Sequence, residues 1–473
     1  MFLTINISET IPENVSIALI ASGNTDFGQF GLSDDEIKYV KAQIEAKSAH
    51  IAINKLSCWI FVQPFEESSP SGKEKMRKSA SKMHQSVCQQ KIQSLVIADA
   101  VGDAALLCAF AEGMVLSNYQ FLKYSGKKAE KQHSLSELTI VGDVDKNEIE
   151  RLNFVLEGVY KTRDLVNEPA NVMNSLQFAD EIEVMGKASG FDVKVFDKAA
   201  IEEMQMGGLL AVNRGSTIPP TFSVLEWKPD VAKNKRPIIL AGKGIIFDTG
   251  GHNLKTGNYM NDMKSDMAGG AVVASTIQAV AKSRLPIHVI GLIPSTDNRL
   301  SADACSPGDI IIMNDGTTVE IDNTDAEGRL ILADTLAYAK KYDPALVIDI
   351  ATLTGSAQRA VGNQGLVAMG NATCEIMNKL KQCGEAVHER IVEFPLWEEY
   401  AEEIKSDIAD LKNTGGENAG MITAGKFLEH FTAYPYIHLD IAGVAFADKT
   451  DNYIIKGGTG FGVRLLFEFL KYY

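Results

Sequence analysis

The sequence predicts an α/β protein, with a smaller N-terminal α/β domain followed by a larger C-terminal α/β catalytic domain. Nearly continuous apolar runs of strand length alternate with longer segments of helical periodicity. This pattern is typical of a mixed, mostly parallel sheet flanked by helices. The chain has 473 residues, which exceeds the size at which a single hydrophobic core usually stops growing. We therefore expect domains at residues 1–145 and 146–473, the second beginning with a connecting helix.

The first domain is expected to combine short buried strands with helices. Apolar runs predict strands at Val15–Ser22, Ser94–Asp99 and Leu138–Asp143, and the periodicity predicts a helix at Ala104–Tyr119. The polar, basic segment Ser125–Ser134 suits a surface loop. A long helical pattern at Lys146–Pro169, ending before the proline, marks the connection to the second domain. This first part of the chain shows no dense cluster of metal-ligating or catalytic residue types.

The second domain alternates apolar runs with helical patterns. Buried strands are predicted at Arg236–Gly242, Pro286–Ile293 and Ala345–Leu353. Helices are predicted at Met263–Arg284 and Arg329–Tyr342. The segment Ile310–Ile321 is predicted to form a hairpin with Asp315-Gly316 at its turn.

Composition excludes several classes of protein. Hydrophobic residues make up 45% and charged residues 23% of the chain, as in ordinary soluble domains. The net charge of −15 disfavours broad binding to nucleic acids or anionic membranes. No apolar run approaches the roughly 20 residues that span a bilayer, and "MFLTINISETIPENV" lacks the basic and apolar regions of a secretory signal. We expect a cytoplasmic protein with no membrane partner.

The cysteines fit neither a zinc ribbon nor a disulfide framework, because no two form a CxxC pair. They are Cys58, Cys88, Cys108, Cys305, Cys374 and Cys383. We expect free, mostly buried thiols in a reducing compartment.

The stretch "NTDAEGRL", from Asn323 to Leu330, gathers charged residues before an apolar helical pattern. If residues 325–329 are extended, Asp325, Glu327 and Arg329 point the same way. Two adjacent carboxylates need a cation between them or must take up a proton, and a divalent metal would serve. Arg329 would then lie at the amino end of a helix, a place that favours an anion. A charged turn that caps a surface helix explains this stretch equally well.

A second group of polar residues lies in Gly242–Gly270, where a predicted strand ends in Gly-Lys-Gly. Lys243 comes first, Asp248 follows in a glycine-bounded loop, Lys255 comes seven residues later, and Asp266 is expected in the next helix. Carboxylates suit Mg²⁺, Mn²⁺ or Zn²⁺, whereas a lysine ligates only as a neutral amine with a strongly lowered pKa. Each residue alone is better explained by a solvated surface. Together they favour a site, because open α/β sheets bind ligands at the carboxyl ends of strands.

With "GKGIIFDTGG…LK…MKSDM", the stretch "NTDAEGRL" resembles the leucyl aminopeptidase family of cytosolic two-metal exopeptidases. Further similar motifs are "RDLVNEPAN", "IDIATLTG", "NAGMITAGKFL" and "HLDIAG", so that the resemblance covers residues 160–473. It implies a homohexamer that acts on peptides with a free N-terminus, and an N-terminal domain with a role in oligomerisation or regulation.

The resemblance also implies the site residues. The metal ligands would be Lys243, Asp248, Asp266, Asp325 and Glu327, with Asp248 and Glu327 bridging two cations. Lys243 and Asp266 would complete the tighter site and Asp325 the more exchangeable one. Lys255 would stabilise the oxyanion, and Arg329 would hold a bicarbonate that serves as general base. The substrate-binding residues would be Met263, Asn323, Thr352, Leu353 and Gly355. The implied preference is for Leu, Met and similar side chains, and core packing is the alternative for Met263.

Several positions depart from the family's commonest pattern, among them Thr249, His252, Asn253, Asn261 and Ala268. None of them is an implied metal ligand, so they bear on the substrate and metal preference more than on activity. For His252, a local hydrogen bond is favoured over a role beside the site.

The identity of the metals stays open, because such a ligand set accepts Zn²⁺, Mn²⁺, Mg²⁺ or Co²⁺. A non-catalytic or DNA-binding homologue is an alternative that the negative charge disfavours. A two-metal phosphoesterase is another, which the lysine ligand and the absence of a phosphate-binding glycine loop disfavour.

Overall fold

The structure is a computed structural model, and it describes residues 2–48 and 51–473. The chain forms two compact units. Unit 1 comprises Met1–Tyr160 with Lys449–Lys456, and unit 2 comprises Lys161–Asp448 with Gly457–Tyr473. The division falls inside helix α5 (Lys146–Asn167), whose residues up to Tyr160 belong to unit 1 and whose residues from Lys161 belong to unit 2.

Unit 1 contains a six-stranded sheet in the order β1-β6-β5-β2-β4-β3, in which only the edge pair β3–β4 is antiparallel. Its strands are β1 (Ile5–Ile7), β2 (Ser16–Ala21), β3 (Ile51–Asn54), β4 (Trp59–Pro64), β5 (Ser94–Asp99) and β6 (Glu137–Val141). Its helices are η1 (Phe27–Phe30), α1 (Asp34–Glu45), α2 (Pro70–Gln89), α3 (Ala104–Asn118), α4 (Lys128–Lys131) and the first part of α5. The central strand β2 is buried along its whole length, as its apolar run predicts. The segment expected as a loop contains the short helix α4.

Unit 2 is built on a nine-stranded sheet in the order β16-β15-β18-β14-β9-β11-β8-β7, with β10 paired to β11. Its strands are β7 (Asp192–Phe196), β8 (Thr221–Trp227), β9 (Ile238–Gly242), β10 (Gly244–Asp248), β11 (Val289–Asn298), β14 (Leu346–Ala351), β15 (Leu366–Gly370), β16 (Ile391–Glu393) and β18 (Tyr436–Asp440). The central pairs are parallel, and β7, β8 and the β15–β18 pair add antiparallel connections. The prediction of a mixed, mostly parallel sheet is therefore confirmed.

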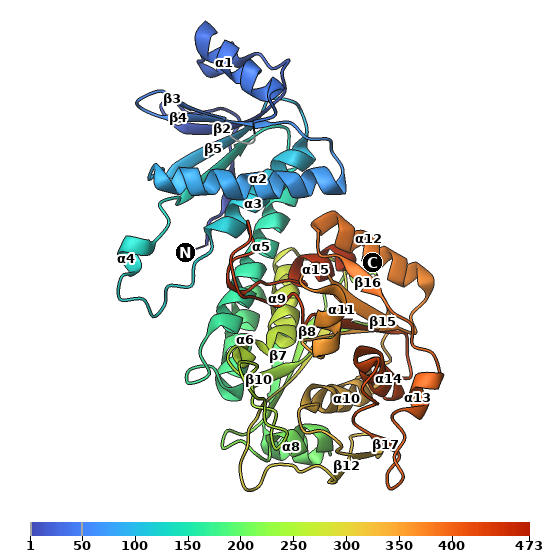
Figure 1. The fold of residues 1–473 in the computed structure, drawn as a ribbon. Coiled ribbons are helices and arrows are strands. Elements are labelled where there is room, and N and C mark those ends of the chain that lie inside the picture. Colours follow the sequence, from blue (N-terminus) through green and yellow to red (C-terminus); the bar gives the residue numbers. More distant parts are fainter. Residues whose placement is uncertain (1, 49–50) are drawn as a thin grey trace. The chain divides into compact units, whose positions relative to one another are not determined.

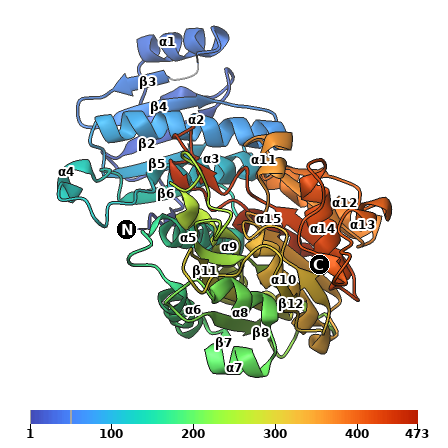
Figure 2. The ribbon, with the colours of Figure 1, turned by 60° about the horizontal axis from the view of Figure 1, so that its bottom comes forward.

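Helices cover both faces of this sheet (Figures 1 and 2). One face packs against α6 (Ser175–Ser189) and α9 (Ala268–Lys282), with α15 (Val463–Tyr472) against α9. The other face packs against α8 (Gly207–Asn213), α10 (Glu327–Ala339) and α14 (Gly420–His430). The remaining helices of unit 2 are α7 (Lys198–Glu203), η2 (Met263–Ser265), η3 (Lys340–Tyr342), α11 (Gly355–Val361), α12 (Cys374–Val387) and α13 (Glu399–Glu402). Layers of this kind bury long apolar strands on both faces, which explains the apolar runs in the sequence.

Short strands complete unit 2. They are β12 (Ile310–Ile312), β13 (Thr318–Glu320), β17 (Leu411–Lys412), β19 (Phe446–Ala447) and β20 (Gly457–Gly458). β12 and β13 form the predicted hairpin, and Gly316 in its turn has φ of 90°, a conformation that favours glycine.

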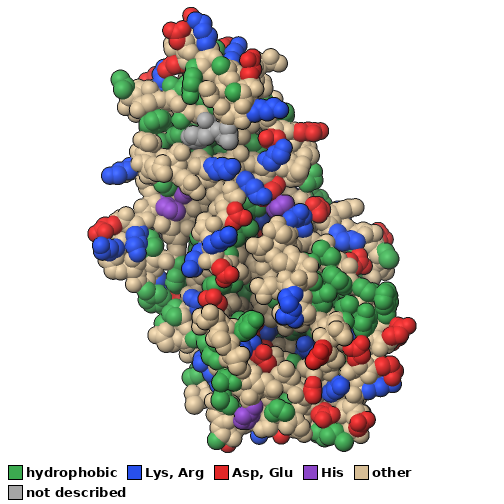
Figure 3. Space-filling model, viewed as in Figure 1, with side chains coloured by type: hydrophobic (Ala, Val, Ile, Leu, Met, Phe, Trp, Pro, Cys, Tyr) green, Lys and Arg blue, Asp and Glu red, His purple; other side chains and the backbone are tan. Residues whose placement is uncertain are grey.

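The cysteines are free, as expected, but the expectation that most are buried is wrong. Only Cys383 is buried, Cys374 is exposed at the first position of α12, and the other four are half-buried. Acidic and basic side chains are interspersed on the face shown in Figure 3. Among the described residues, no helix combines the length and the apolar character that crossing a membrane requires.

Candidate active site

The candidate site lies where parallel strands of the unit 2 sheet end. β9, β10, β11 and β14 run parallel, so their carboxyl ends meet at one edge of the sheet. Lys243 directly follows β9, Asp248 ends β10, Asn298 ends β11, and Thr352 directly follows β14. The sheet thus brings together polar residues that lie more than 100 positions apart in the chain.

Lys243 is buried at this edge, with 3% of its surface exposed. Its Nζ lies 2.7 Å from Asp266 Oδ1 and 3.0 Å from Glu327 Oε1, and it donates a hydrogen bond of 2.9 Å to the carbonyl oxygen of Thr352. Gly328 makes room for this side chain, because a Cβ at that position would lie 2.7 Å from Nζ. The lysine is therefore held in one position by three partners.

Lys255 pairs with the other two carboxylates. Its Nζ lies 2.8 Å from Asp248 Oδ2 and 2.6 Å from Asp325 Oδ1. Its side chain is 14% exposed, whereas that of Lys243 is 4% exposed. Lys255 thus lies on the more open side of the cluster.

The carboxylates have properties that fit a cation site. Oxygens of Asp248, Asp325 and Glu327 lie within 4.8 Å of one another, and Asp266 Oδ2 is buried without a hydrogen-bond partner among the described residues. Four carboxylates face two lysines, which leaves an excess of negative charge when all are ionised. Burial, together with the neighbouring Asp248 and Glu327, raises the pKa of Asp325 to about 7. The arrangement therefore needs additional positive charge, and hard oxygen ligands suit divalent cations.

The lysines are charged in these surroundings. Burial by itself lowers the pKa of Lys243, but Asp266 and Glu327 overcome this effect and raise the pKa above its ordinary value. Asp248 and Glu327 likewise raise the pKa of Lys255 against the effect of burial. Ligation by Lys243 as a neutral amine therefore requires that bound cations reverse the field of the carboxylates.

Two local expectations are wrong. Residues 325–329 are not extended, because Glu327 is the first residue of α10 and Ala326 precedes it as the cap. Asp266 does not lie in a long helix either, because it directly follows η2 as its C-cap, and α9 begins two residues later. Glu327 and Asp325 still meet, since the turn before α10 brings Asp325 back toward the sheet edge. The predicted position of Arg329 in the first turn of that helix is confirmed.

Asn298, which was not predicted from the sequence, connects two of the carboxylates. Its Nδ2 donates to Asp248 Oδ1 at 2.8 Å and to Glu327 Oε2 at 3.4 Å, and also to the carbonyl oxygen of Thr324 at 3.1 Å. It is 5% exposed. Its position at the carboxyl end of a long apolar strand could have predicted it, because Lys243 and Asp248 have the same position relative to β9 and β10.

Asn413, just after β17, is a second residue that the analysis missed. Its Oδ1 accepts hydrogen bonds from the backbone N–H groups of Asp322 and Asn323, and its Nδ2 donates to the carbonyl oxygen of Asn323. Its own carbonyl oxygen accepts from Arg329 Nη1 at 2.8 Å. Asn413 therefore fixes both the turn that carries Asp325 and the guanidinium that follows.

Arg329 is buried with few partners. It is 8% exposed, and its Nε has no hydrogen-bond partner among the described residues. Burial lowers the pKa of this guanidinium to about 10, so it stays charged at neutral pH. A buried cation with a free donor fits a small anion.

The predicted substrate-binding residues lie in three places. Thr352 and Leu353 follow β14, and Gly355 begins α11. Thr352 Oγ1 donates to Asp266 Oδ1 at 2.7 Å, so its side chain also orients a predicted metal ligand. Met263 begins η2 and is half-buried, which does not fit a core residue. Asn323 Oδ1 accepts from the Asp325 N–H at 2.8 Å and shapes the turn before α10.

Two of the family departures have local partners. His252 is exposed, and its Nδ1 lies 2.8 Å from the carbonyl oxygen of Cys305, as the local interpretation predicts. Asn253 accepts a hydrogen bond from the Thr324 N–H, and its own N–H donates to Thr324 Oγ1. Asn253 thus supports the turn that leads to Asp325.

Among the described residues, the other three departures form no hydrogen bond with the predicted ligands. Thr249 donates to the carbonyl oxygen of Asn298 at 2.9 Å. Ala268 is the buried first residue of α9, and Asn261 is exposed in the loop before η2.

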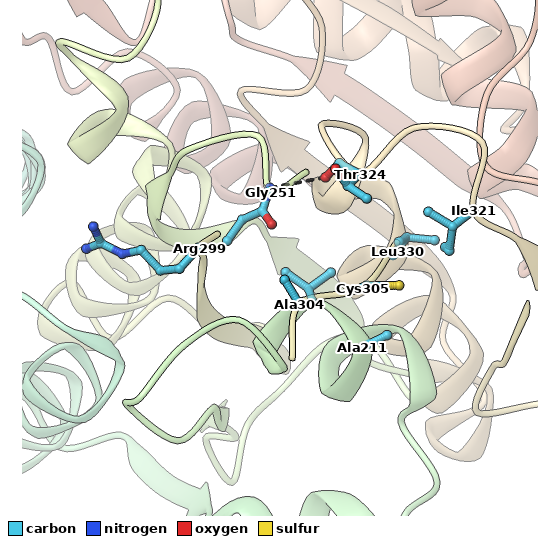
Figure 4. Close-up of a pocket in the computed structure, with 10 residues that line it drawn as sticks. Ala211, Gly251, Arg299, Ala304, Cys305, Ile321, Thr324 and Leu330 are labelled. Atoms are coloured by element: carbon cyan, nitrogen blue, oxygen red, sulfur yellow. Dashed lines mark hydrogen bonds between the residues drawn. The ribbon is translucent and has the colours of Figure 1, made fainter. Parts of the chain in front are cut away.

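A small pocket lies behind this edge of the sheet (Figure 4). Its lining includes Gly251, Thr324, Cys305 and Leu330. Asn298 and Thr324, which share a hydrogen bond, also line this pocket, and Asn298 is the one of the two that contacts Asp248 and Glu327. The pocket is mostly apolar in its lining and holds none of the predicted metal ligands.

Comparison with known proteins gives a consistent result. Residues 160–467 match the catalytic domain of the cytosol aminopeptidase family. A probable cytosol aminopeptidase of Chloroherpeton thalassium is 49% identical over 335 residues, which are 70% of this chain and 65% of that protein. The chain therefore spans just under two thirds of that relative. A probable cytosol aminopeptidase of Chlorobium limicola is 43% identical over 420 residues, covering 84% of this chain and 83% of that protein.

Two solved structures have the same fold. A mutant of tomato leucine aminopeptidase matches with a TM-score of 0.88 and 28% identity, and the match covers 100% of this chain and 97% of that one. The bottromycin maturation enzyme BotP matches with a TM-score of 0.86 and 28% identity, and the match covers 98% of this chain and 99% of that one.

Proposed function

Because the chain belongs to the cytosol aminopeptidase family, a family of peptide hydrolases, we propose that it releases amino-terminal residues from peptides with a free N-terminus. The proposed preference is for Leu and other apolar first residues, which the name of the tomato enzyme supports. The observation that carries the proposal is the cluster of four carboxylates and two lysines at the carboxyl edge of the sheet.

The proposed cofactors are two divalent cations per chain, Zn²⁺ or Mn²⁺, with Mg²⁺ or Co²⁺ as alternatives. The residues that would hold them are Lys243, Asp248, Asp266, Asp325 and Glu327. The unpartnered Oδ2 of Asp266 and the excess of carboxylate charge support this set, and BotP has been solved in complex with Mn. When bound, two such cations lower the pKa of a shared water and polarise a substrate carbonyl.

Lys255 and Arg329 supply the remaining chemistry in this proposal. The ammonium of Lys255 donates to the oxyanion that forms on the scissile carbonyl, and its place on the open side of the cluster supports this role. Arg329 would hold a bicarbonate ion, which would supply a general base beside the leaving amine. The free Nε of its buried guanidinium supports an anion there.

Met263, Thr352, Leu353 and Gly355 form the proposed wall for the first side chain of the peptide, with Asn323 beside them. We further propose a homohexamer, a role of residues 1–145 in oligomerisation or regulation, and a cytoplasmic location. The family to which the chain belongs supports these assignments.

The test is release of leucine from a leucyl peptide by the purified chain. Activity should disappear after chelation and return with Mn²⁺ or Zn²⁺, and Asp325→Ala and an amino-blocked peptide should give no release. If no metal restores cleavage, the proposal is wrong, and the DNA-binding alternative should then be tested by gel shift. Cleavage of the amino-blocked peptide would show an endopeptidase instead.

A further inference from the structure

Unit 1 contains a cluster of His84, Cys88 and His133 whose ligand atoms lie within 4.8 Å of one another. The expectation that this part of the chain holds no cluster of metal-ligating types is therefore wrong. The reason is distance in the chain, because the third residue lies 45 positions after the second. These side chains take no part in the chemistry proposed for unit 2.

The geometry of the cluster begins with helix α2. His84 and Cys88 are four residues apart, so they lie one above the other on the same face. Cys88 Sγ lies 3.5 Å from Nε2 and 4.0 Å from Nδ1 of His84. Zinc bonds of about 2.0 Å to nitrogen and 2.3 Å to sulfur imply a tetrahedral N···S edge of about 3.6 Å. Because Nε2 of His84 also lies 2.9 Å from Asn118 Oδ1, the nitrogen left for a metal is Nδ1, and its distance of 4.0 Å from Sγ is about 0.4 Å wider than this edge.

His133 reaches the same place from the segment between α4 and β6. Its ring centroid lies 4.8 Å from that of His84. Asn118, at the end of α3, fixes both rings: its Oδ1 is 2.9 Å from His84 Nε2, and its carbonyl oxygen is 3.3 Å from His133 Nδ1. Each of these nitrogens must donate, so the other nitrogen of each ring keeps its lone pair. A carbonyl that orients the imidazole of a metal ligand in this way is typical of zinc sites.

The surroundings of the sulfur fit the same role. The backbone N–H groups of Ser134 and Leu135 act against burial in setting the pKa of Cys88, and donors of this kind stabilise a thiolate. Burial lowers the pKa of His84 to about 4, so its imidazole is neutral at pH 7. Burial raises the pKa of Cys88, so the thiol would lose its proton only when a cation binds.

We propose that His84, Cys88 and His133 form a second, previously unassigned metal site that binds one Zn²⁺ ion with an open fourth position. Two imidazoles and one thiolate favour zinc or another borderline-soft ion over Mg²⁺ or Ca²⁺. The carboxylates and amine of the unit 2 site contain no sulfur, which makes the two sites distinguishable by spectroscopy.

Cobalt provides the first test, because Co²⁺ can occupy zinc sites. Co²⁺ bound by a thiolate has a charge-transfer absorption band in the near ultraviolet. The full-length, metal-free chain titrated with Co²⁺ should show this band, and Asp325→Ala should show it as well. Cys88→Ser should abolish it, and His133→Gln should weaken Co²⁺ binding at this site at least about tenfold. Cys58→Ser, at another half-buried cysteine of unit 1, is the matched control and should retain the band.

A second measurement needs no variant and covers the case in which Cys88→Ser fails to fold. Zn²⁺ should slow alkylation of Cys88 in the wild-type chain by at least about tenfold, because a metal-bound sulfur is a poorer nucleophile, while Cys58 serves as the internal standard. The proposal is overturned if wild-type protein gives no thiolate band and Zn²⁺ leaves alkylation of Cys88 unchanged. It is equally overturned if the band persists in Cys88→Ser.

Discussion

At Gly328, the addition of a single methyl group in Gly328→Ala should lower activity much more than it lowers the stability of the fold. An added Cβ would lie 2.6 Å from Cε, 2.7 Å from Nζ and 2.9 Å from Cδ of Lys243. Ordinary contacts begin near 3.5 Å, so in Gly328→Ala the ammonium must retreat by about 0.8 Å. It cannot do so freely, because Asp266, Glu327 and the carbonyl oxygen of Thr352 hold it at 2.7, 3.0 and 2.9 Å.

The expected result is a large loss of activity with a small loss of stability. A misplacement of about 1 Å at a catalytic centre costs roughly 100-fold in rate. Overpacking costs about 1–3 kcal/mol, but alanine gains about 1 kcal/mol over glycine within a helix. The free energy of unfolding should therefore fall by only about 0–2 kcal/mol.

The assay is kcat for leucine release, measured beside metal content and thermal unfolding. Gly420→Ala is the control in the first turn of another helix, because a Cβ there meets only the Ser356 side chain, at 3.2 and 3.8 Å. It should change kcat less than about twofold, as surface-like changes do. Wild-type kcat and metal content in Gly328→Ala would refute the argument that the fixed position of Lys243 matters.

Three further predictions concern other parts of the chain. Asn298→Ala removes hydrogen bonds to Asp248 and Glu327 and should weaken metal binding about 10–100-fold. The affinity is measured from activity as a function of free metal concentration, and an unchanged metal affinity would contradict the prediction. The raised pKa of Asp325, about 7, means that a proton must leave before a cation binds. The affinity for divalent cations should therefore fall as the pH drops below 7. Calorimetry in buffers of different ionisation enthalpy should show that binding releases protons. A cation affinity that does not change between pH 6 and 8 would count against this prediction. The pKa of Glu36 is lowered to about 2, first by its hydrogen bond with the Lys55 ammonium and then by the hydrogen bond that it accepts from the Ser33 N–H. A lowered pKa stabilises the fold above pH 4.5, so Glu36→Gln should cost about 1 kcal/mol at pH 7, and the difference should shrink as pH falls toward 2; denaturant unfolding at both pH values is the check.

Much of the fold could be predicted because burial leaves a local pattern. Ser94–Asp99 is predicted and observed with the same bounds, since its four inner residues are buried and apolar, as expected for a strand covered on both faces. Boundaries near the site were less predictable. Glu327 begins α10 instead of continuing an extended segment, because the turn before it is fixed by Asn413 and Asn253, which come from distant parts of the chain.

By itself, the sequence determined which residues are proposed to carry the chemistry in unit 2. Lys243, Asp248, Asp325 and Glu327 are found together at one sheet edge, as the rule for carboxyl ends of parallel strands predicts. Their spacing within two short segments made them visible without coordinates.

Only the tertiary structure decided which distant residues complete these groups. Asn298 meets Asp248 because β10 and β11 are neighbours in the sheet, and His133 meets His84 because Asn118 holds both rings. In each case the partners are joined by packing and hydrogen bonds between elements far apart in the chain. Such contacts leave no periodic signal, because one polar residue at the right place is enough to make them.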